Sequence, residues 1–242
     1  VNLSESVMVT PTEDDYTINT DGTLTGLSTT YLNGLSAEQK KNINLVIPYS
    51  VDGTTVTAIG DKAFSFWYND KYSGFDFVSL DLSNATNLTR IGNEAFYYAK
   101  NITGDLIIPD SVTIIGNNAF RECTGLNGKL VLPDDLLSIE SYAFFNCRFT
   151  GQLKLPSKLE KIGNNAFKID PSASFTGKLV IPESVKSIET VAFSGQQGIT
   201  SVIFEGNNIT ALPDSVFRYC SGLNGTIIIP DSVQTIGKNT FV

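Results

Sequence analysis

The sequence has no histidine among its 242 residues. Histidine is the commonest general base, the commonest metal ligand and the side chain that titrates near neutral pH. Its absence removes the usual chemistry of hydrolases, zinc sites and pH switches. We therefore expect no enzyme activity, no metal site and no cofactor. A pair of carboxylates, as glycosidases use, is the one catalytic arrangement left, and it needs a cleft and one raised pKa.

Positive charge is also in short supply, with 17 basic against 25 acidic residues and a net charge of −8. Such a charge repels phosphates, so we expect no nucleic-acid partner. Long hydrophobic runs are missing too, because no apolar stretch reaches the roughly 18 residues that a membrane span needs. The hydrophobic share of 41% is ordinary for a folded protein.

Eight copies of the phrase Ile-Gly-x-x-Ala-Phe, four of them degenerate, follow one another from residue 59 onward. The copies are Ile59–Phe64, Ile91–Phe96, Ile115–Phe120, Ile139–Phe144, Ile162–Phe167, Ile188–Phe193, Leu212–Phe217 and Ile236–Phe241. Successive phenylalanines lie 23 to 32 residues apart. A period of this length is one turn of a solenoid, whose repeats bury their apolar side chains only against their neighbours. A solenoid offers a surface rather than a pocket, which favours binding over catalysis.

One repeat, residues 104–127, shows how each turn is built. Alternation predicts a strand over residues 106–108, with Ile107 pointing outward, and Pro109 ends it. Asn117 stands where a short helix would begin and would cap it. The equivalent positions are Asp61, Asn93, Ser141, Asn164, Thr190, Asp214 and Lys238. The phenylalanines are expected to form a ladder of rings in the interior.

The pattern A-F-x-x-C-x-x-L-x-x-x-L-x-I-P-x-S-V-x-x-I-G resembles the BspA-like leucine-rich repeat of bacterial and protozoan surface proteins. The resemblance covers residues 45–242 and departs from the pattern at residues 64–96, which are longer, and at 201–206, which lack the proline. It implies an α/β-type repeat solenoid: a right-handed superhelix with short strands on one face and short helices or turns on the other. It also implies an extracellular protein, surface-attached or secreted, with a role in adhesion. It supplies neither a ligand nor a catalytic residue.

Three segments are expected. Residues 1–15 are polar and acidic and are interpreted as a flexible arm or linker. Residues 16–44 are interpreted as an N-terminal cap, made of a hairpin and a short helix that starts at Ser36. Residues 45–242 form the eight repeats, of which the last is incomplete. Because solenoids need polar caps, we expect further protein or a partner at that end, including end-to-end self-association. Because Val1 comes first, we also expect a trimmed N-terminus.

The outward residue of each strand is the first candidate binding surface. These residues are Val46, Asp81, Ile107, Val131, Lys154, Val180, Ile203 and Ile228. Six of the eight are apolar and β-branched. They indicate either an apolar strip for a partner or simply the strand propensity of Val and Ile.

Aromatic residues gather in the long repeat between Phe64 and Phe77. Trp67 occupies the position that Cys123 holds in its own repeat, so we expect it in the core. Tyr68 and Tyr72 stand beside polar residues, and we expect them to be exposed. Exposed rings would stack on sugars or proteins, whereas the alternative is that a longer repeat needs more aromatic mass to stay ordered.

Two further columns have plain structural explanations. Cys123, Cys147 and Cys220 share one position, and a disulfide between the first two is sterically conceivable. Their apolar neighbours and the family resemblance favour buried free thiols. Acidic residues follow the prolines at Asp110, Asp134, Glu183 and Asp231. They would bind a cation or, more simply, bond the backbone of the turn.

Two functions remain in view. The first is a non-catalytic surface or secreted module that binds an extracellular protein or glycan. Its candidate residues are Val46, Ile107, Val131, Lys154, Val180, Ile203, Ile228, Tyr68 and Tyr72. The alternative is a structural spacer that displays another domain from the cell envelope.

Overall fold

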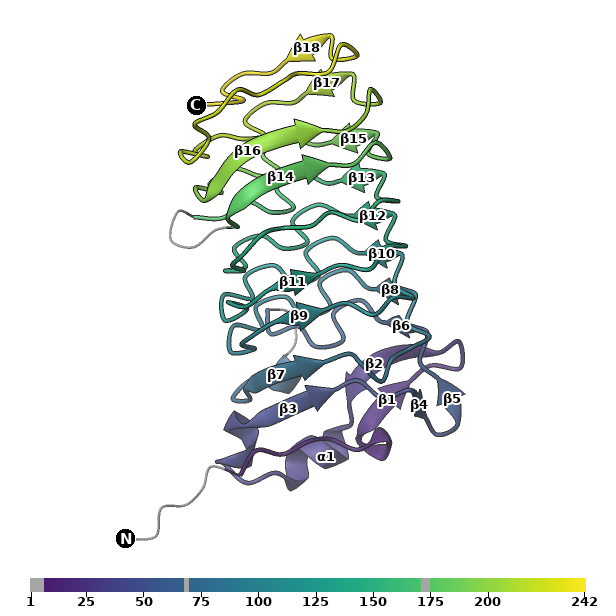
Figure 1. Ribbon diagram of the computed structural model, residues 1–242. Coiled ribbons are helices and arrows are strands. Elements are labelled where there is room, and N and C mark those ends of the chain that lie inside the picture. The colour runs from purple at the N-terminus through teal and green to yellow at the C-terminus, as the bar shows by residue number, and fades with distance from the viewer. Residues whose placement is uncertain (1–6, 68–69, 171–174) are drawn as a thin grey trace, which may run out of the picture.

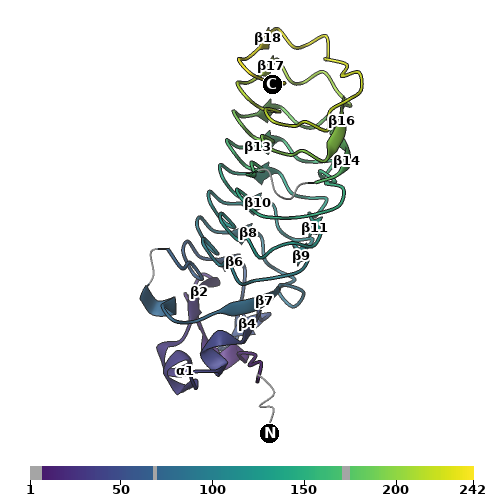
Figure 2. The same ribbon diagram turned by 90° about the vertical axis from the view of Figure 1, so that its left-hand side faces the viewer.

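Successive repeats stack as rungs along one axis in the computed structural model, which describes residues 7–67, 70–170 and 175–242 (Figure 1). Each rung contributes to two rows of strands and to a row of turns. The first strand row lies at the front in Figure 1 and the second along the right-hand side. Figure 2 shows the two strand rows on different sides of the stack. No helix in the described part of the chain is long and apolar enough to cross a membrane.

The N-terminal region contains the predicted hairpin. Strands β1 (Tyr16–Ile18) and β2 (Thr23–Leu27) pair in antiparallel fashion. A 3-10 helix at Gln39–Lys41 carries the expected capping box, because Ser36 and Gln39 exchange hydrogen bonds of 2.9 and 3.2 Å. Helix α1 (Thr29–Gly34), capped by the Ser28 hydroxyl, was not predicted.

Residues 7–15, which we interpreted as a flexible arm, contact the rest of the chain. The Val9 amide donates to the Asn42 carbonyl at 2.9 Å, and Val9 pairs with Ile43 in a parallel bridge. A 3-10 helix at Glu13–Asp15 follows. The division of the chain at residues 15 and 44 stays a prediction.

The second strand row joins the hairpin to the repeats in one sheet, whose strands are parallel from β2 onward. After β2 it contains β6 (Ala58–Ile59), β8 (Arg90–Ile91), β10 (Ile114–Ile115), β12 (Ser138–Ile139), β13 (Lys161–Ile162) and β15 (Ser187–Ile188). The pair β17 (Ala211–Leu212) and β18 (Thr235–Ile236) follows. Each isoleucine aligns with the isoleucine of the next rung, as between Ile91 and Ile115.

The first strand row is made of three parallel pairs. They are β3 (Ile43–Val46) with β7 (Phe77–Asp81), β9 (Leu106–Ile107) with β11 (Leu130–Val131), and β14 (Gly177–Ile181) with β16 (Ile199–Phe204). A small antiparallel hairpin, β4 (Ser50–Val51) and β5 (Thr54–Thr55), branches off after β3. In β9 and the residue after it, Leu106 and Ile108 are buried while Ile107 is 61% exposed, which confirms the predicted alternation.

Of the short helices or turns expected on this face, the structure has turns, and the helix expected to begin at Asn117 is wrong. Residues 117–122 form consecutive turns, in which the Arg121 amide donates to the Asn118 carbonyl at 3.1 Å. Other amides donate to the next rung instead, as from Phe120 to Ala143 at 2.8 Å. Residues such as Asn118 and Glu122 adopt a positive φ that breaks a helix. The fold is therefore dominated by strands and turns, and the right-handed sense of the superhelix stays a prediction.

The predicted capping residues cap the adjacent rung rather than a helix of their own. The Asn93 side-chain carbonyl accepts from the Asn117 amide at 2.9 Å, and the Asp61 carboxylate accepts from the Asn93 amide at 2.8 Å. An Asn or Asp at this position therefore joins two rungs. This explains why short polar side chains recur there without any helix.

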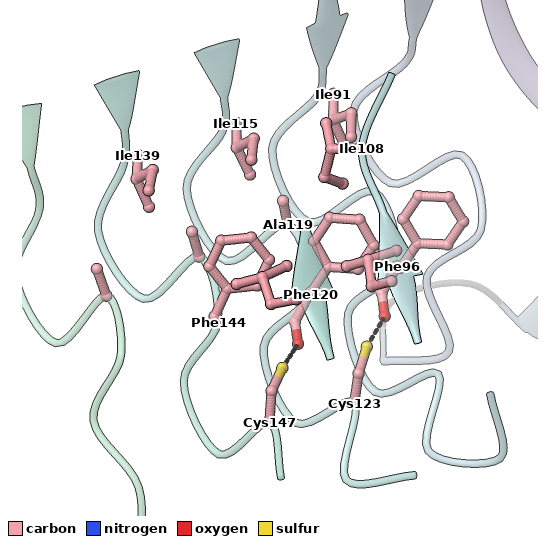
Figure 3. Packing of buried hydrophobic residues seen from close by; sticks show 14 of the residues in the cluster. Ile91, Phe96, Ile108, Ile115, Ala119, Phe120, Cys123, Ile139, Phe144 and Cys147 are labelled. Atoms are coloured by element: carbon pink, nitrogen blue, oxygen red, sulfur yellow. Dashed lines mark hydrogen bonds between the residues drawn. The ribbon is translucent and has the colours of Figure 1, made fainter. Parts of the chain in front are cut away.

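The interior contains the predicted ladder of phenylalanine rings. Phe96, Phe120 and Phe144 stack face to face, with ring centroids 5.0 and 5.5 Å apart (Figure 3). The isoleucines of the second strand row flank the rings on one side and the cysteines on the other (Figure 3). The stack continues to Phe241, whose ring lies 5.8 Å from that of Phe217 and is 41% exposed.

Val191 is the residue with the least suitable backbone conformation. Its φ of 62° is left-handed, which costs a β-branched residue more than most. Asn118 and Asn165 hold the equivalent position with φ of 56° and 55°. Val191→Asn is therefore expected to raise the free energy of unfolding by about 1 kcal/mol, measured by urea denaturation. As a control, Asn118→Val should lower it by a similar amount. A loss of stability in the Val191 variant would contradict this account.

Lys161 neutralises two glutamates that replace the glycine of the repeat phrase. Its ammonium group lies 2.7 Å from the Glu140 carboxylate and 3.6 Å from the Glu189 carboxylate. The hydrogen bond to Glu140 raises the pKa of Lys161. Burial raises the pKa of Glu140, but hydrogen bonds from Lys161 and Ser138 outweigh it and hold that pKa below its ordinary value.

Lys161→Met is expected to lower the free energy of unfolding by about 1 kcal/mol near neutral pH, since the ammonium is partly exposed and solvent screens the pair. Because the folded pKa of Glu140 is depressed, the pair stabilises the fold above about pH 5 and stops doing so as the pH falls through the folded pKa. Urea denaturation at pH 7 and at pH 3 should show the difference from wild type shrink. Lys158→Met, which removes an exposed ion pair with Asp135, should change little at either pH. An effect of Lys161→Met that is the same at both pH values would contradict the role of Glu140.

Candidate binding groove

The outward residues of the first strand row form an exposed ridge. Ile107 is 61% exposed, Val131 45%, Ile203 43% and Ile228 78%. Asp81 and Lys154 are exposed, while Val46 and Val180 are half-buried. The structure thus brings the seven predicted residues of this row, together with Asp81, to the strand positions that we expected. Lys154 and Ile228 do so from extended segments that are not assigned as strands.

A groove follows this ridge where the strands turn at the prolines. One stretch, of about 640 Å³, is lined by Asp81, Ile107 and Pro109. The next, of about 510 Å³, is lined by Val131, Pro133 and Lys154. Asp110 lines both stretches, so they adjoin. We name this surface the strand groove.

The strand groove continues along the later rungs. The third stretch, of about 520 Å³, shares Asp134 and Lys154 with the second and adds Val180. Glu205 lines this stretch and also the last one, which contains Ile228. The groove therefore spans most of the repeats and includes five of the seven predicted first-row residues at its walls.

Acidic side chains dominate the walls of the strand groove. They are Asp81, Asp105, Asp110, Asp134, Glu205 and Asp231, against the two cations Lys129 and Lys154. Within the described residues, no group of three His, Cys, Asp or Glu side chains is placed to hold a metal ion. The groove combines apolar side chains with a negative potential, which suits a partner that presents apolar and basic groups.

The turns that follow the prolines are held by serine. The Ser111 hydroxyl donates to the Leu88 carbonyl of the preceding rung at 2.7 Å. The Ser232 hydroxyl does the same to the Ile209 carbonyl at 2.7 Å. The neighbouring Asp110 and Asp231 are exposed, so their carboxylates face the solvent beside the groove.

Tyr72 does not belong to a binding surface, and our expectation that it is exposed was wrong. It lies in a 3-10 helix at Asp70–Tyr72 and is fully buried. Its hydroxyl donates to the Ala63 carbonyl at 2.8 Å and accepts from the Leu27 amide at 3.1 Å. Its ring packs on Phe64 and Phe77. The tyrosine joins the hairpin to the long repeat, as the alternative interpretation of the aromatic residues required.

Trp67 shows the opposite error. We expected it in the core, but its side chain is 54% exposed and its ring lies 4.6 Å from that of Tyr98. The interior that it would fill is occupied by Tyr72 and Phe77, which come from the residues added to this repeat. Tyr68 lies outside the described residues.

The cysteines are buried free thiols, as favoured from the sequence. The thiols of Cys123, Cys147 and Cys220 donate to the carbonyls of Phe96, Phe120 and Phe193 at 3.0 to 3.2 Å (Figure 3). At the same position Gln196 donates to the Phe167 carbonyl at 2.5 Å. Burial raises the pKa of all three thiols, that of Cys220 to about 12, so none is a thiolate nucleophile at neutral pH.

Sequence reasoning missed a second, partly exposed surface, on the row of turns. It contains Trp67, Tyr98, Arg121, Phe145 and Lys168, which follow the Ala-Phe pairs of successive repeats. Aligning the repeats on that phenylalanine would have shown Tyr97, Arg121, Phe145 and Lys168 in one column. We selected the outward residues of the first strand row instead, because their pattern in the sequence is more regular.

Several solved structures are similar to this chain. A leucine-rich repeat protein of T. pallidum (TpLRR) is 25% identical with a TM-score of 0.54, over 94% of this chain and 85% of that chain. A leucine-rich repeat protein from Bacteroides ovatus is 20% identical with a TM-score of 0.44, over 95% and 79%. A leucine-rich cell surface protein from Faecalibacterium prausnitzii is 20% identical with a TM-score of 0.40, over 93% and 83%. No protein of curated function matches the chain.

One family matches most of the sequence. Its description is the BspA type leucine rich repeat region, which matches in six copies over residues 43–167, 89–223 and 172–242. The matched residues include every rung described above and all seven predicted residues of the first strand row. The chain belongs to the BspA-type leucine-rich repeat family.

Proposed function

We propose that this chain is a non-catalytic binding module of a bacterial cell-surface or secreted protein, and that it holds a protein partner in the strand groove. Membership of the BspA-type family supports a surface role. The observation that carries the proposal is the exposed ridge of Ile107, Val131, Ile203 and Ile228 beside the adjoining stretches of the strand groove. Large apolar side chains left exposed in a row are typical of interaction sites.

The energetics of the ridge support binding rather than chemistry. Burying one valine or isoleucine side chain contributes about 1.5–3 kcal/mol, so a few contacts along several rungs suffice for a specific complex. Catalysis by carboxylates would need one acid with a raised pKa in an enclosed site. The carboxylates of the groove, such as Asp110 and Asp134, stand exposed on successive rungs.

A binding screen with paired variants tests this function. Wild-type protein is probed by surface plasmon resonance against purified matrix and bacterial envelope proteins. The double variant I107S/V131S is expected to bind a captured protein with an affinity at least about tenfold lower than that of the wild type, without a change in its own melting temperature. The matched control is I114S/L137S, because Ile114 in β10 and Leu137 directly before β12 are 38% and 43% exposed and lie away from the strand groove.

Two results would overturn the proposal. If no protein binds, the chain is better explained as a spacer. If the control variant weakens binding as much as I107S/V131S does, the strand groove is not the site.

A further inference from the structure

Aromatic and basic side chains, most of them half-buried, form one run of contacts along the row of turns. The rings of Trp67 and Tyr98 lie 4.6 Å apart, and the Lys100 ammonium lies 4.4 Å from the centre of the Tyr98 ring. The Arg121 guanidinium lies 4.9 Å from the Tyr142 ring and 5.1 Å from the Phe145 ring. We name this surface the aromatic strip.

The contacts of the strip run from rung to rung without a break. Trp67 lies 5.8 Å from Tyr97, and Arg121 lies 5.4 Å from Tyr97. At the far end, the Lys168 ammonium lies 5.2 Å from the Phe145 ring. The strip therefore spans the five rungs that carry Phe64, Phe96, Phe120, Phe144 and Phe167. It belongs to the turns, so it is separate from the strand groove.

The strip is positive on a protein whose net charge is −8. In the part of the chain that the structure describes, neither Lys100, Arg121 nor Lys168 forms an ion pair with a carboxylate. Two acids lie at the strip: the Glu122 carboxylate accepts from the Asn146 amide group at 3.0 Å, and the Asp170 backbone amide donates to the Asn146 side-chain oxygen at 3.1 Å. Three cations against two acids leave a local excess of one positive charge, which favours an anionic ligand.

We propose that the aromatic strip is a binding site for an acidic glycan, a saccharide that carries carboxylate groups. The half-exposed Trp67 ring offers a flat apolar face for the C–H groups of a sugar ring. Lys100, Arg121 and Lys168 supply charge-assisted hydrogen bonds to carboxylates. Glu122 and Asn146 supply an acceptor and a donor for hydroxyl groups.

The pitch of the stack suits a linear polymer. Rungs joined by parallel strands repeat about every 4.8 Å, so Arg121 and Lys168, which are two rungs apart, lie roughly 10 Å apart along the axis. That is about the length of two linked sugars, so a uronic acid polymer, which carries a carboxylate on every sugar, can bring one carboxylate to each of these two cations. An acidic peptide would use the cations but not the aromatic rings. A nucleic acid carries so much negative charge that the surrounding acidic surface would repel it.

Calorimetric titration tests the site with two sources of carboxylated sugar. The probes are an oligogalacturonate, a sialylated oligosaccharide and the same oligogalacturonate with its carboxylates reduced to alcohols. The wild type is expected to bind at least one acidic probe and not the reduced one, and to bind more weakly as salt is added. The preferred acidic probe distinguishes uronic from sialic acid.

The variants separate the strip from the rest of the surface. Trp67→Ala and the double variant K100Q/K168Q should each weaken binding about tenfold. The matched controls are Tyr49→Ala, a tyrosine that is 52% exposed at another place, and K129Q/K154Q in the strand groove. Both controls should bind like wild type, and so should I107S/V131S, so a failure here leaves the function of the strand groove unaffected.

Four outcomes would overturn the proposal. They are no binding of either acidic probe at millimolar concentration, equal binding of the reduced probe, equal losses in the control variants, and tighter binding of polyglutamate or of single-stranded RNA. Melting temperatures of all variants are compared first, so that a loss of fold is not taken for a loss of binding.

Discussion

Replacing Phe120 with alanine is expected to lower the free energy of unfolding by about 3–5 kcal/mol. The ring is fully buried and stacks between those of Phe96 and Phe144, at 7° to each. Backbone hydrogen bonds fix the spacing of the rungs, as between the Phe120 amide and the Ala143 carbonyl at 2.8 Å. The neighbouring rungs are therefore held apart and do not collapse into the space left by the ring, which keeps the cost at the high end for a core residue.

Urea denaturation followed by circular dichroism measures this loss, and Phe241→Ala is the matched control. Phe241 has one ring neighbour in the stack and is 41% exposed, so its loss should cost much less. The denaturant slope also matters, because a repeat stack weakened in its middle separates into two parts that unfold with smaller slopes. Equal losses at Phe120 and Phe241 would contradict the ring ladder as a source of stability.

The ladder and the first strand row followed from the sequence because they depend on side-chain pattern alone, whereas the second strand row, to which Ile114 and Ile115 belong, was not predicted. An isoleucine and a phenylalanine at a constant spacing define the interior, and Pro109 defines the end of a strand. The turns did not follow, because Asn117 before Ala119 and Phe120 is a good start for a helix as well. Hydrogen bonds to the next rung, such as that from Phe120, decide the matter, and a single repeat does not contain that information.

The candidate site residues also fall into two groups: those that a sequence pattern predicts and those that depend on packing between distant residues. Ile107 and Val131 were predicted because a strand's outward positions depend on a period of two. We predicted Trp67 in the core and Tyr72 at the surface, which is the wrong way round, because no other repeat has the length of the long repeat and can be aligned with it. Their positions depend on which aromatic ring fills the space beside Phe64, and this is settled by packing among distant residues such as Leu27.

Gly195→Ala is expected to cost about 2–5 kcal/mol, for two independent reasons. Gly195 has a φ of 85°, a left-handed conformation that costs alanine about 1–2 kcal/mol. A Cβ atom there would also lie 1.9 Å from the Ile169 carbonyl oxygen, which is part of the backbone of the rung below. Moving that backbone adds the cost of overpacking, about 1–3 kcal/mol.

The equivalent positions of other rungs show why the clash is local to Gly195. Glu122 and Tyr219 stand two residues after their phenylalanines with φ of 61° and 60°, and both carry side chains. Ile169, one rung below Gly195 at the same position, is not among the residues with positive φ. Its carbonyl therefore points differently and occupies the space that a side chain at 195 would need.

Gly104→Ala separates the two contributions. Gly104 has a φ of 90° and no atom within 4 Å of a Cβ placed on it, so only the conformational cost applies. In urea denaturation it should lose about 1–2 kcal/mol, and the additional loss at Gly195 measures the contact with Ile169. If both variants lose the same free energy of unfolding, the backbone at Ile169 moves away from the new side chain at little cost. In that case rungs of unequal length adjust to one another, and the regular spacing would be a property of the phenylalanine ladder alone.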